Sequence, residues 1–207
     1  MCTCPNWRPF LEENNTNNIR AVILGIPGVG KTTVISKVVK SLEQRGFNTA
    51  TVIFGTVMFE EAKKMGLKNR DEIRKLSISK QRLLQQHAAK RIAKMHENIV
   101  IIDTHLFIKT SEWYYPGIPM QVIDIIKPTH LLLVMADPEE VIKRRKNDSS
   151  RHRDILSTKE IQHELDISKM MIVSCANLTG SPFAIIMNNS NEADNTSSDI
   201  IRILVGT

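Results

Sequence analysis

The segment from Gly25 to Thr32 has residue types and spacing suited to binding a polyphosphate. It reads Gly-Ile-Pro-Gly-Val-Gly-Lys-Thr and fits the pattern G-x-x-x-x-G-K-[ST] at every position. Glycines let the backbone turn its N–H groups around phosphates, the lysine reaches the outer phosphates, and the threonine hydroxyl binds Mg²⁺. A chance glycine-rich turn is the alternative, but an apolar run precedes the segment and an amphipathic helical pattern follows it. We therefore interpret it as a P-loop, with Lys31 and Thr32 as the lysine and hydroxyl.

A carboxylate follows a second apolar run. Asp103 is the first acidic residue after Ile99–Ile102, an unbroken β-branched run typical of a buried parallel strand. P-loop proteins place a carboxylate near Mg²⁺ at such a position, whereas the alternative is an ordinary aspartate in a turn. Because a P-loop is also present, we favour the metal role and pair Asp103 with Thr32. His105 either lines the site or bonds within its loop, and we do not predict it to be a general base.

Phosphate chemistry also needs cations, and arginine binds phosphate oxygens bidentately. Two arginines end a predicted helix and two lie in the polar segment that follows it: Arg144, Arg145, Arg151 and Arg153. A solvated basic face is the alternative. We interpret residues 144–156 as a short lid that closes over bound phosphates.

A second anionic ligand is indicated between the P-loop and Asp103. Arg70 and Arg74 are four residues apart, so one helical face would present both, although an exposed ion-pair face with nearby acids is the alternative. Gly55 and Thr56 lie where the second strand ends and a helix opens, and backbone N–H groups and a hydroxyl can meet an anion there. Two phosphate-facing regions favour phosphoryl transfer over hydrolysis.

Composition limits the class of protein. The chain has 207 residues, enough for one domain without disulfide or metal support, and its three cysteines form no zinc pattern. It has no apolar run of about 20 residues and no secretory segment, so we expect a cytoplasmic protein without a membrane span. The net charge of +6 comes with only 5% aromatic residues, which are not interleaved with the basic ones, so we expect no nucleic-acid partner.

Strand and helix patterns alternate after a polar segment of residues 1–18, which we interpret as a flexible extension of a single domain spanning 19–207. This alternation predicts an α/β fold, a five-stranded parallel sheet flanked by helices in three layers. The expected strands are 21–24, 49–54, 98–103, 129–135 and 183–187. The main expected helices are 31–45, 57–65, 70–76, 79–96, 120–126, one from 138, one from 157 and 199–204, with 190–198 as a surface loop.

Several blocks outside the P-loop make the chain resemble archaeal-type adenylate kinases, from about Ile19 to its C-terminus. The most specific are Phe-Gly-Thr-Val-Met-Phe at 54–59 and Asp-Thr-His at 103–105. Further similar segments are Arg-Asp-x-x-Arg-Lys-Leu at 70–76, Ile-Lys-Thr at 108–110, Tyr-Pro-Gly-Ile-Pro at 115–119 and Leu-Thr-Gly at 178–180.

The resemblance implies a P-loop nucleoside monophosphate kinase that transfers a phosphoryl group from MgATP to AMP, commonly as a cytoplasmic homotrimer. Residues that it assigns to the ATP phosphates are Gly25, Ile26, Pro27, Gly28, Val29, Gly30, Lys31, Thr32 and Thr33. It assigns Gly55, Thr56, Arg70 and Arg74 to AMP, and Arg144, Arg151 and Arg153 to the lid. Asp103 is followed by Thr-His rather than the bacterial Gly-Phe-Pro-Arg, so the arginines that bind the acceptor are less closely defined than the P-loop.

Other functions remain open at this stage. A kinase of the same architecture could phosphorylate another small acceptor, and a regulatory or nucleic-acid-associated ATPase could use the same P-loop. The products formed from MgATP and each nucleoside monophosphate would separate these possibilities.

Overall fold

The described part of the chain folds around one parallel sheet in a computed structural model, which describes residues 19–110, 112–147 and 157–206. Five strands lie in the order β2-β3-β1-β6-β7. Their bounds are β1 Ile19–Leu24, β2 Thr49–Ile53, β3 Ile99–Asp103, β6 His130–Met135 and β7 Phe183–Met187. The expected five-stranded parallel sheet is thereby confirmed.

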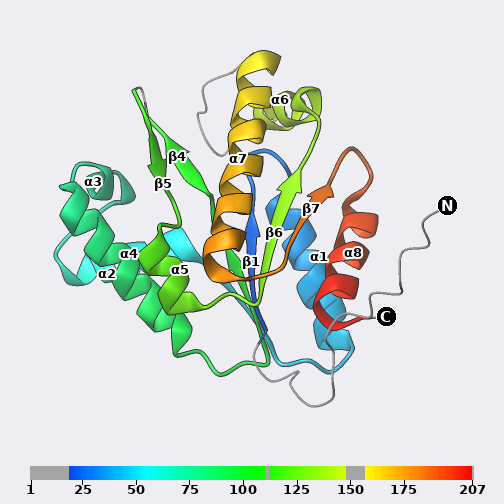
Figure 1. Ribbon diagram of the computed structural model, residues 1–207, viewed down its shortest axis with the longest axis horizontal. Helices are drawn as coiled ribbons and strands as arrows, with labels where there is room; N and C mark the ends of the chain where they lie inside the picture. Colours follow the sequence, from blue (N-terminus) through cyan, green and yellow to red (C-terminus); the bar gives the residue numbers. More distant parts are fainter. Residues whose placement is uncertain (1–18, 111, 148–156, 207) are drawn as a thin grey trace.

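Helices cover both faces of the sheet and produce three layers (Figure 1). One face carries α1 (Lys31–Gln44) and α8 (Ala193–Val205). The other face carries α4 (Ile78–Ala93), α5 (Met120–Ile126) and α7 (Thr158–Thr179). Three further helices are α2 (Phe54–Lys64), α3 (Arg70–Arg74) and α6 (Pro138–Asn147).

The central strands are apolar because both of their faces are covered. In β1, Ala21 to Leu24 are fully buried, and β3 and β6 flank this strand with runs of Ile, Leu and Val. Parallel pairing sets Ile23 beside Asp103 and Leu24 beside Leu133. The carboxyl ends of β1 and β3 therefore open onto the same edge of the sheet, which is where ligands bind in folds of this kind.

A two-stranded antiparallel ribbon was not predicted from the sequence. It consists of β4 (Phe107–Lys109) and β5 (Tyr114–Pro116), and it projects from the carboxyl edge of the sheet beyond β3 (Figure 1). Each strand has three residues, too few for an alternating pattern to stand out. The ribbon base is fixed where Gly117 N–H donates to Leu106 O at 2.8 Å.

Two helices begin several residues earlier than predicted. The last helix begins at Ala193 rather than 199, so residues 193–198 are not loop. Its polar first turns are helical because the Thr196 hydroxyl donates to Met187 O and the Ser197 hydroxyl to Asp194 O, which satisfies both buried groups. The helix expected from Val57 already begins at Phe54, so β2 ends one residue earlier.

Helix α7 begins as its sequence predicts. The Ser157 hydroxyl accepts from Glu160 N–H at 3.3 Å, and the Glu160 carboxylate accepts from Ser157 N–H at 2.9 Å. This reciprocal capping box satisfies two backbone donors at the helix start. Residues 1–18 and most of the segment interpreted as a lid lie outside the described residues.

Candidate active site

The P-loop connects β1 to α1 and turns through three glycines with positive φ. These angles are 149° at Gly25, 95° at Gly28 and 91° at Gly30. A β-carbon on Gly25 would lie 2.5 Å from Val134 O, and one on Gly30 would collide with Nδ2 of Asn188. The loop therefore needs glycine at these two positions for both its backbone angles and its close packing.

Side chains from outside the loop hold its carbonyl groups. Arg144 Nη1 donates to Val29 O at 3.0 Å, and Asn188 Nδ2 donates to the same oxygen at 2.7 Å. Arg145 Nε donates to Pro27 O at 2.9 Å. These bonds fix the orientation of the peptide groups before any phosphate arrives, which is the preorganisation that electrostatic catalysis requires.

Lys31, Asp103 and His105 meet beside Gly25. Lys31 is buried, its Nζ donates to Gly25 O at 2.7 Å, and it lies 3.2 Å from Nδ1 of His105 and 3.9 Å from Oδ1 of Asp103. His105 Nδ1 is itself 2.7 Å from Gly25 O. The expected P-loop lysine and strand-end carboxylate are thus close together, and His105 lies beside them, the first of the two positions that the sequence left open.

The Asp103 carboxyl group lies in a largely buried position, with 16% of its side chain exposed. Burial raises its pKa above the usual value, and the nearby Lys31 ammonium lowers it in part. The ionised carboxylate is therefore held at some cost in stability, as is common where charge is required for function.

Thr32 and Asp103 fit the role of magnesium ligands in chemical type. Both offer oxygen donors, and Thr32 lies exposed in the first turn of α1 with Thr33. Among the described residues, no group of three or more His, Cys, Asp or Glu side chains could hold a metal. This donor set suits Mg²⁺ that keeps several waters and arrives with phosphates, because Mg²⁺ is commonly bound through one or two protein oxygens.

The second predicted region is exposed. Arg70 Nη2 donates to the Thr56 hydroxyl at 2.7 Å, which joins α3 to the start of α2. Gly55 lies in the first turn of α2, and a β-carbon there would meet nothing within 4 Å. Arg74 extends into solvent with 72% of its side chain exposed and lies 3.8 Å from Asp71. The structure brings Thr56 and Arg70 together, whereas Arg74 belongs to a loose surface pair.

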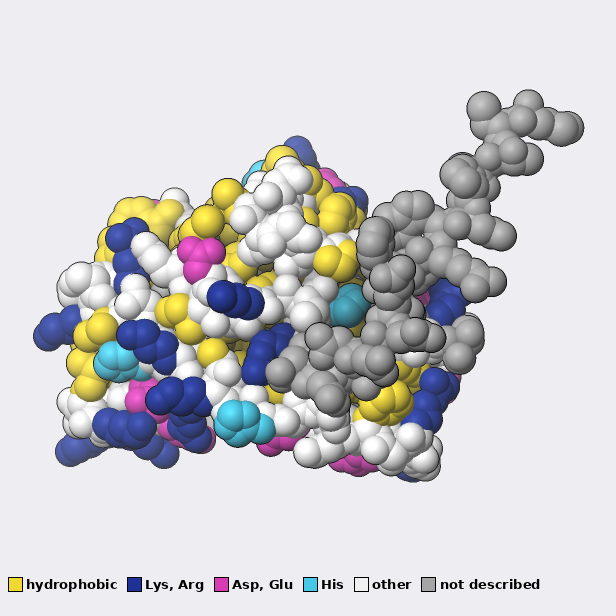
Figure 2. Space-filling model, turned by 60° about the horizontal axis from the view of Figure 1, so that its bottom comes forward, with side chains coloured by type: hydrophobic (Ala, Val, Ile, Leu, Met, Phe, Trp, Pro, Cys, Tyr) yellow, Lys and Arg dark blue, Asp and Glu magenta, His cyan; other side chains and the backbone are white. Residues whose placement is uncertain are grey.

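Basic side chains gather around this region. In Figure 2 the lysines and arginines crowd the lower left of the molecule, the side on which α2, α3 and α4 lie in Figure 1. Exposed members of this basic lobe are Lys63, Lys64, Lys68, Arg70, Arg74, Lys75, Lys80, Arg82, Lys90, Arg91 and Lys94. Their summed field attracts small anionic ligands toward the lobe.

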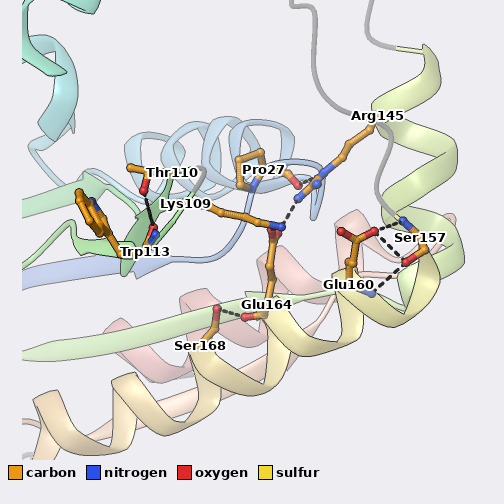
Figure 3. Close-up of polar contacts among 9 residues, drawn as sticks. All are labelled: Pro27, Lys109, Thr110, Trp113, Arg145, Ser157, Glu160, Glu164 and Ser168. Atoms are coloured by element: carbon orange, nitrogen blue, oxygen red, sulfur yellow. Dashed lines mark hydrogen bonds and ion pairs between the residues drawn. The ribbon is translucent and has the colours of Figure 1, made fainter. Parts of the chain in front are cut away.

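The predicted lid arginines divide into two groups. Arg151 and Arg153 lie outside the described residues, whereas Arg144 and Arg145 contact the P-loop backbone. Arg145 also lies 3.3 Å from Glu164 on α7 (Figure 3). Its guanidinium therefore contacts Pro27 O and Glu164 and supports the P-loop from outside.

Two residues at the site were missed in the sequence. Asn188 directly follows β7, as Asp103 ends β3, and both reach the same edge of the sheet; the position after an apolar strand was the available signal. Glu164 is a carboxylate within the apolar stripe of Ile161, Leu165 and Ile172. A charged residue on a buried helical face indicates a paired partner, because unpaired buried charge is costly.

Comparisons with known proteins show which family the chain resembles in sequence. A family model described as an AAA domain matches residues 24–162. The chain is 39% identical to the adenylate kinase of Methanocaldococcus jannaschii, over 88% of this chain and 96% of that protein. It is 42% identical to the adenylate kinase of Methanopyrus kandleri, over 87% of this chain and 94% of that protein.

Solved structures support the fold alone. A shikimate kinase from Acinetobacter baumannii, solved in complex with shikimate, superposes with a TM-score of 0.58 at 14% identity, covering 91% of this chain and 94% of that one. The two adenylate kinases are much more similar to this chain in sequence, and the match covers nearly the whole length of each. The chain belongs to the adenylate kinase family.

Proposed function

We propose that the protein is an ATP:AMP phosphotransferase, which converts MgATP and AMP reversibly into two ADP. One observation carries the proposal: a braced P-loop with a buried lysine lies in the same domain as a second cationic region at Thr56 and Arg70. A protein that only hydrolyses ATP needs the first region but has little use for the second. Family membership supports adenine nucleotides on both sides.

The chemistry needs no nucleophile from the enzyme, because an AMP phosphate oxygen is already ionised. It attacks the γ-phosphorus in line, and the ADP oxygen leaves on the opposite side. The P-loop N–H groups and Lys31 neutralise charge on the donor, while Arg70 and the Thr56 hydroxyl position the acceptor. Arg144, Arg151 and Arg153 are proposed to surround the transferred group.

Mg²⁺ is the proposed cofactor, held by the Thr32 hydroxyl and by Asp103 directly or through water. When bound with ATP, it would neutralise charge on the phosphate oxygens. The pairing of an exposed hydroxyl with a carboxylate at the neighbouring strand end supports this assignment.

A cavity of about 270 Å³ beside α4, the ribbon and α5 is a candidate site for the acceptor base. Gln85 Nε2 donates to Pro116 O at 3.2 Å, while its buried Oε1 has no hydrogen-bond partner among the described residues. The exocyclic amine of adenine would supply the missing donor. Tyr115 and Arg82 also line the cavity.

Assembly and location rest on the family. We propose a homotrimer in the cytoplasm, and exposed apolar side chains on α7 and the edge strand β7 offer surface for subunit contact: Met170, Val173, Leu178, Phe183, Ile185 and Met187. None of the helices in the described ranges is long and apolar enough to cross a membrane. Sedimentation velocity would measure the oligomeric state.

The test is product analysis with purified protein. ADP with Mg²⁺ should yield equal amounts of ATP and AMP, and MgATP should phosphorylate AMP faster than CMP, GMP or UMP. Diadenosine pentaphosphate should compete with both substrates, because one tethered molecule would occupy both sites.

Other products would redirect the assignment. Inert ADP with slow release of inorganic phosphate from MgATP would mean an ATPase. Inert ADP with phosphorylation of a different acceptor would retain the mechanism and reject AMP.

A further inference from the structure

Glu164 is a buried carboxylate on α7, outside the residues expected to touch either nucleotide. Its side chain is 6% exposed, and its two oxygens face different cations: Oε1 lies 3.6 Å from Lys109 Nζ, and Oε2 lies 3.3 Å from Arg145 Nη2. Figure 3 shows both cations converging on it from separate segments of the chain. A buried carboxylate between two cations joins those segments through charge-assisted contacts.

The contact through Arg145 ends on the P-loop. While one edge of the guanidinium meets Glu164, Nε donates to Pro27 O at 2.9 Å (Figure 3). The aliphatic stem also packs on the loop, since a β-carbon at Gly28 would lie 3.0 Å from Cγ of Arg145. Arg145, on α6, thus connects Glu164 of α7 to the phosphate-binding turn, and only 8% of its side chain is exposed.

The contact through Lys109 ends on the ribbon. Lys109 is the last residue of β4, and the ribbon also approaches α7 through Tyr114, whose ring lies 6.4 Å from that of His163. Phe107 packs edge-on against Tyr114 with ring centroids 5.0 Å apart. The ribbon is therefore held to α7 beside Glu164, and it carries Tyr115 and Pro116 toward the proposed acceptor cavity.

We propose that Glu164 is a positioning residue for the phosphate donor site: it holds Arg145 against the P-loop and, through Lys109, ties the β4–β5 ribbon to the same arginine. Its charge fixes the direction of the Arg145 guanidinium, and that direction fixes the Pro27 peptide group. The P-loop is then kept ready for phosphate by a carboxylate that never touches the ligand. This inference deepens the proposed function and rests on its assignment of the P-loop to MgATP.

The test replaces the charge while keeping the shape. In E164Q, the dissociation constant for MgATP should rise about 10- to 100-fold, measured calorimetrically without acceptor, because the P-loop loses its brace. The acceptor KM should rise less, by about threefold, because Glu164 reaches the acceptor cavity only indirectly, through Lys109 and the ribbon. E164D keeps the charge on a shorter stem and should recover part of the affinity.

D166N is the matched control. Asp166 lies two residues further along the same helix and pairs with Gln162 at 2.9 Å and Lys169 at 3.1 Å. Half of its side chain is exposed, and both of these partners lie on α7 itself. Its MgATP affinity should equal that of the wild type. K109M should weaken MgATP binding about threefold, and this effect should largely vanish when Glu164 is already Gln, because the charge pair between the two residues is then already lost.

Defined outcomes overturn the proposal. If E164Q binds MgATP as the wild type does and only its melting temperature falls, Glu164 is merely structural. If E164Q does not fold, E164D and K109M decide the matter, and wild-type affinity in both rejects the positioning role. If the wild type binds MgATP but phosphorylates no AMP, the proposed reaction fails while weaker binding by E164Q still supports the brace.

Discussion

The donor and acceptor sides of this domain differ in how firmly their residues are held. On the donor side, Lys31 is buried and the P-loop carbonyls accept bonds from Arg144, Arg145 and Asn188. On the acceptor side, Arg70 and Arg74 are exposed, and Arg70 has a single side-chain hydrogen bond, to Thr56, within the described ranges. We infer that the P-loop is formed before its ligand arrives, whereas the proposed acceptor side is completed by its ligand.

This difference has an energetic reason. Many donors must converge on the triphosphate, and fixing them in advance avoids reorganisation during the reaction. The acceptor must enter and leave, so exposed arginines on the short helix α3 can adjust as it binds. We therefore expect substitutions on the donor side to affect catalysis and those on the acceptor side to affect acceptor affinity.

The largest effect should come from removing the buried cation. K31M should lower kcat by about 10³-fold, roughly 4 kcal/mol of transition-state stabilisation, because the donor phosphates lose a preorganised cation. Steady-state kinetics measure the loss, and circular dichroism checks that the fold persists. Near-normal turnover would reject the assignment of the P-loop.

The next largest effect should come from disturbing the close packing of the P-loop around Gly30. G30A should reduce kcat/KM for MgATP by about 10²-fold, since its φ is 91° and the new methyl group meets Asn188. G46A is the matched control, because Gly46 also has a positive φ, 85°, but its β-carbon would meet nothing within 4 Å. Kinetics with varied MgATP should give G46A a kcat/KM within about twofold of the wild type.

On the acceptor side, R70A should raise the KM for AMP about tenfold, close to 1.4 kcal/mol, with the KM for MgATP unchanged. R74A should have a smaller effect, because Arg74 lacks the contact to Thr56. Initial rates with each substrate varied would measure both. If R70A raises only the KM for MgATP, our division of the molecule into two sides is wrong.

The smallest effect concerns stability. Burial raises the pKa of Asp103, so the folded state binds its proton more tightly than the unfolded state does. The stability contributed by the protonated form is then lost as pH rises from the unfolded pKa through the folded one, and it remains absent at neutral pH. D103N should therefore melt about 2 to 4 °C above the wild type at pH 7.

Thermal melts from pH 3 to pH 7 test this expectation. The advantage of D103N should shrink at the acid end, where Asp103 is protonated in the wild type as well. A difference that does not change with pH would show that ionisation is not its cause. Phosphoryl transfer by D103N should nevertheless fall, because the proposed metal ligand is lost.

Local sequence determined the sheet and the chemistry of its loops. Runs such as Ile99–Ile102 favour buried strands of a covered sheet, and the P-loop pattern sets its own turn through its glycines. Thr32 belongs to that pattern, and Asp103 could be placed near it because the ends of neighbouring parallel strands share one edge of the sheet. The polar composition of residues 193–198 led to the wrong prediction of a loop. These residues are helical, and two of their hydroxyl groups donate to backbone carbonyls.

Only the tertiary structure decided which side chains brace the loop. Asn188, Glu164 and Lys109 lie 84 to 163 positions from Gly25, and no local pattern in the sequence indicates that they meet around the P-loop. Whether these side chains reach the P-loop depends on how α7, β7 and the ribbon are packed relative to β1 and the P-loop. Spacing along the chain specifies backbone turns and helix faces, whereas contacts between distant polar groups depend on the packing of whole elements.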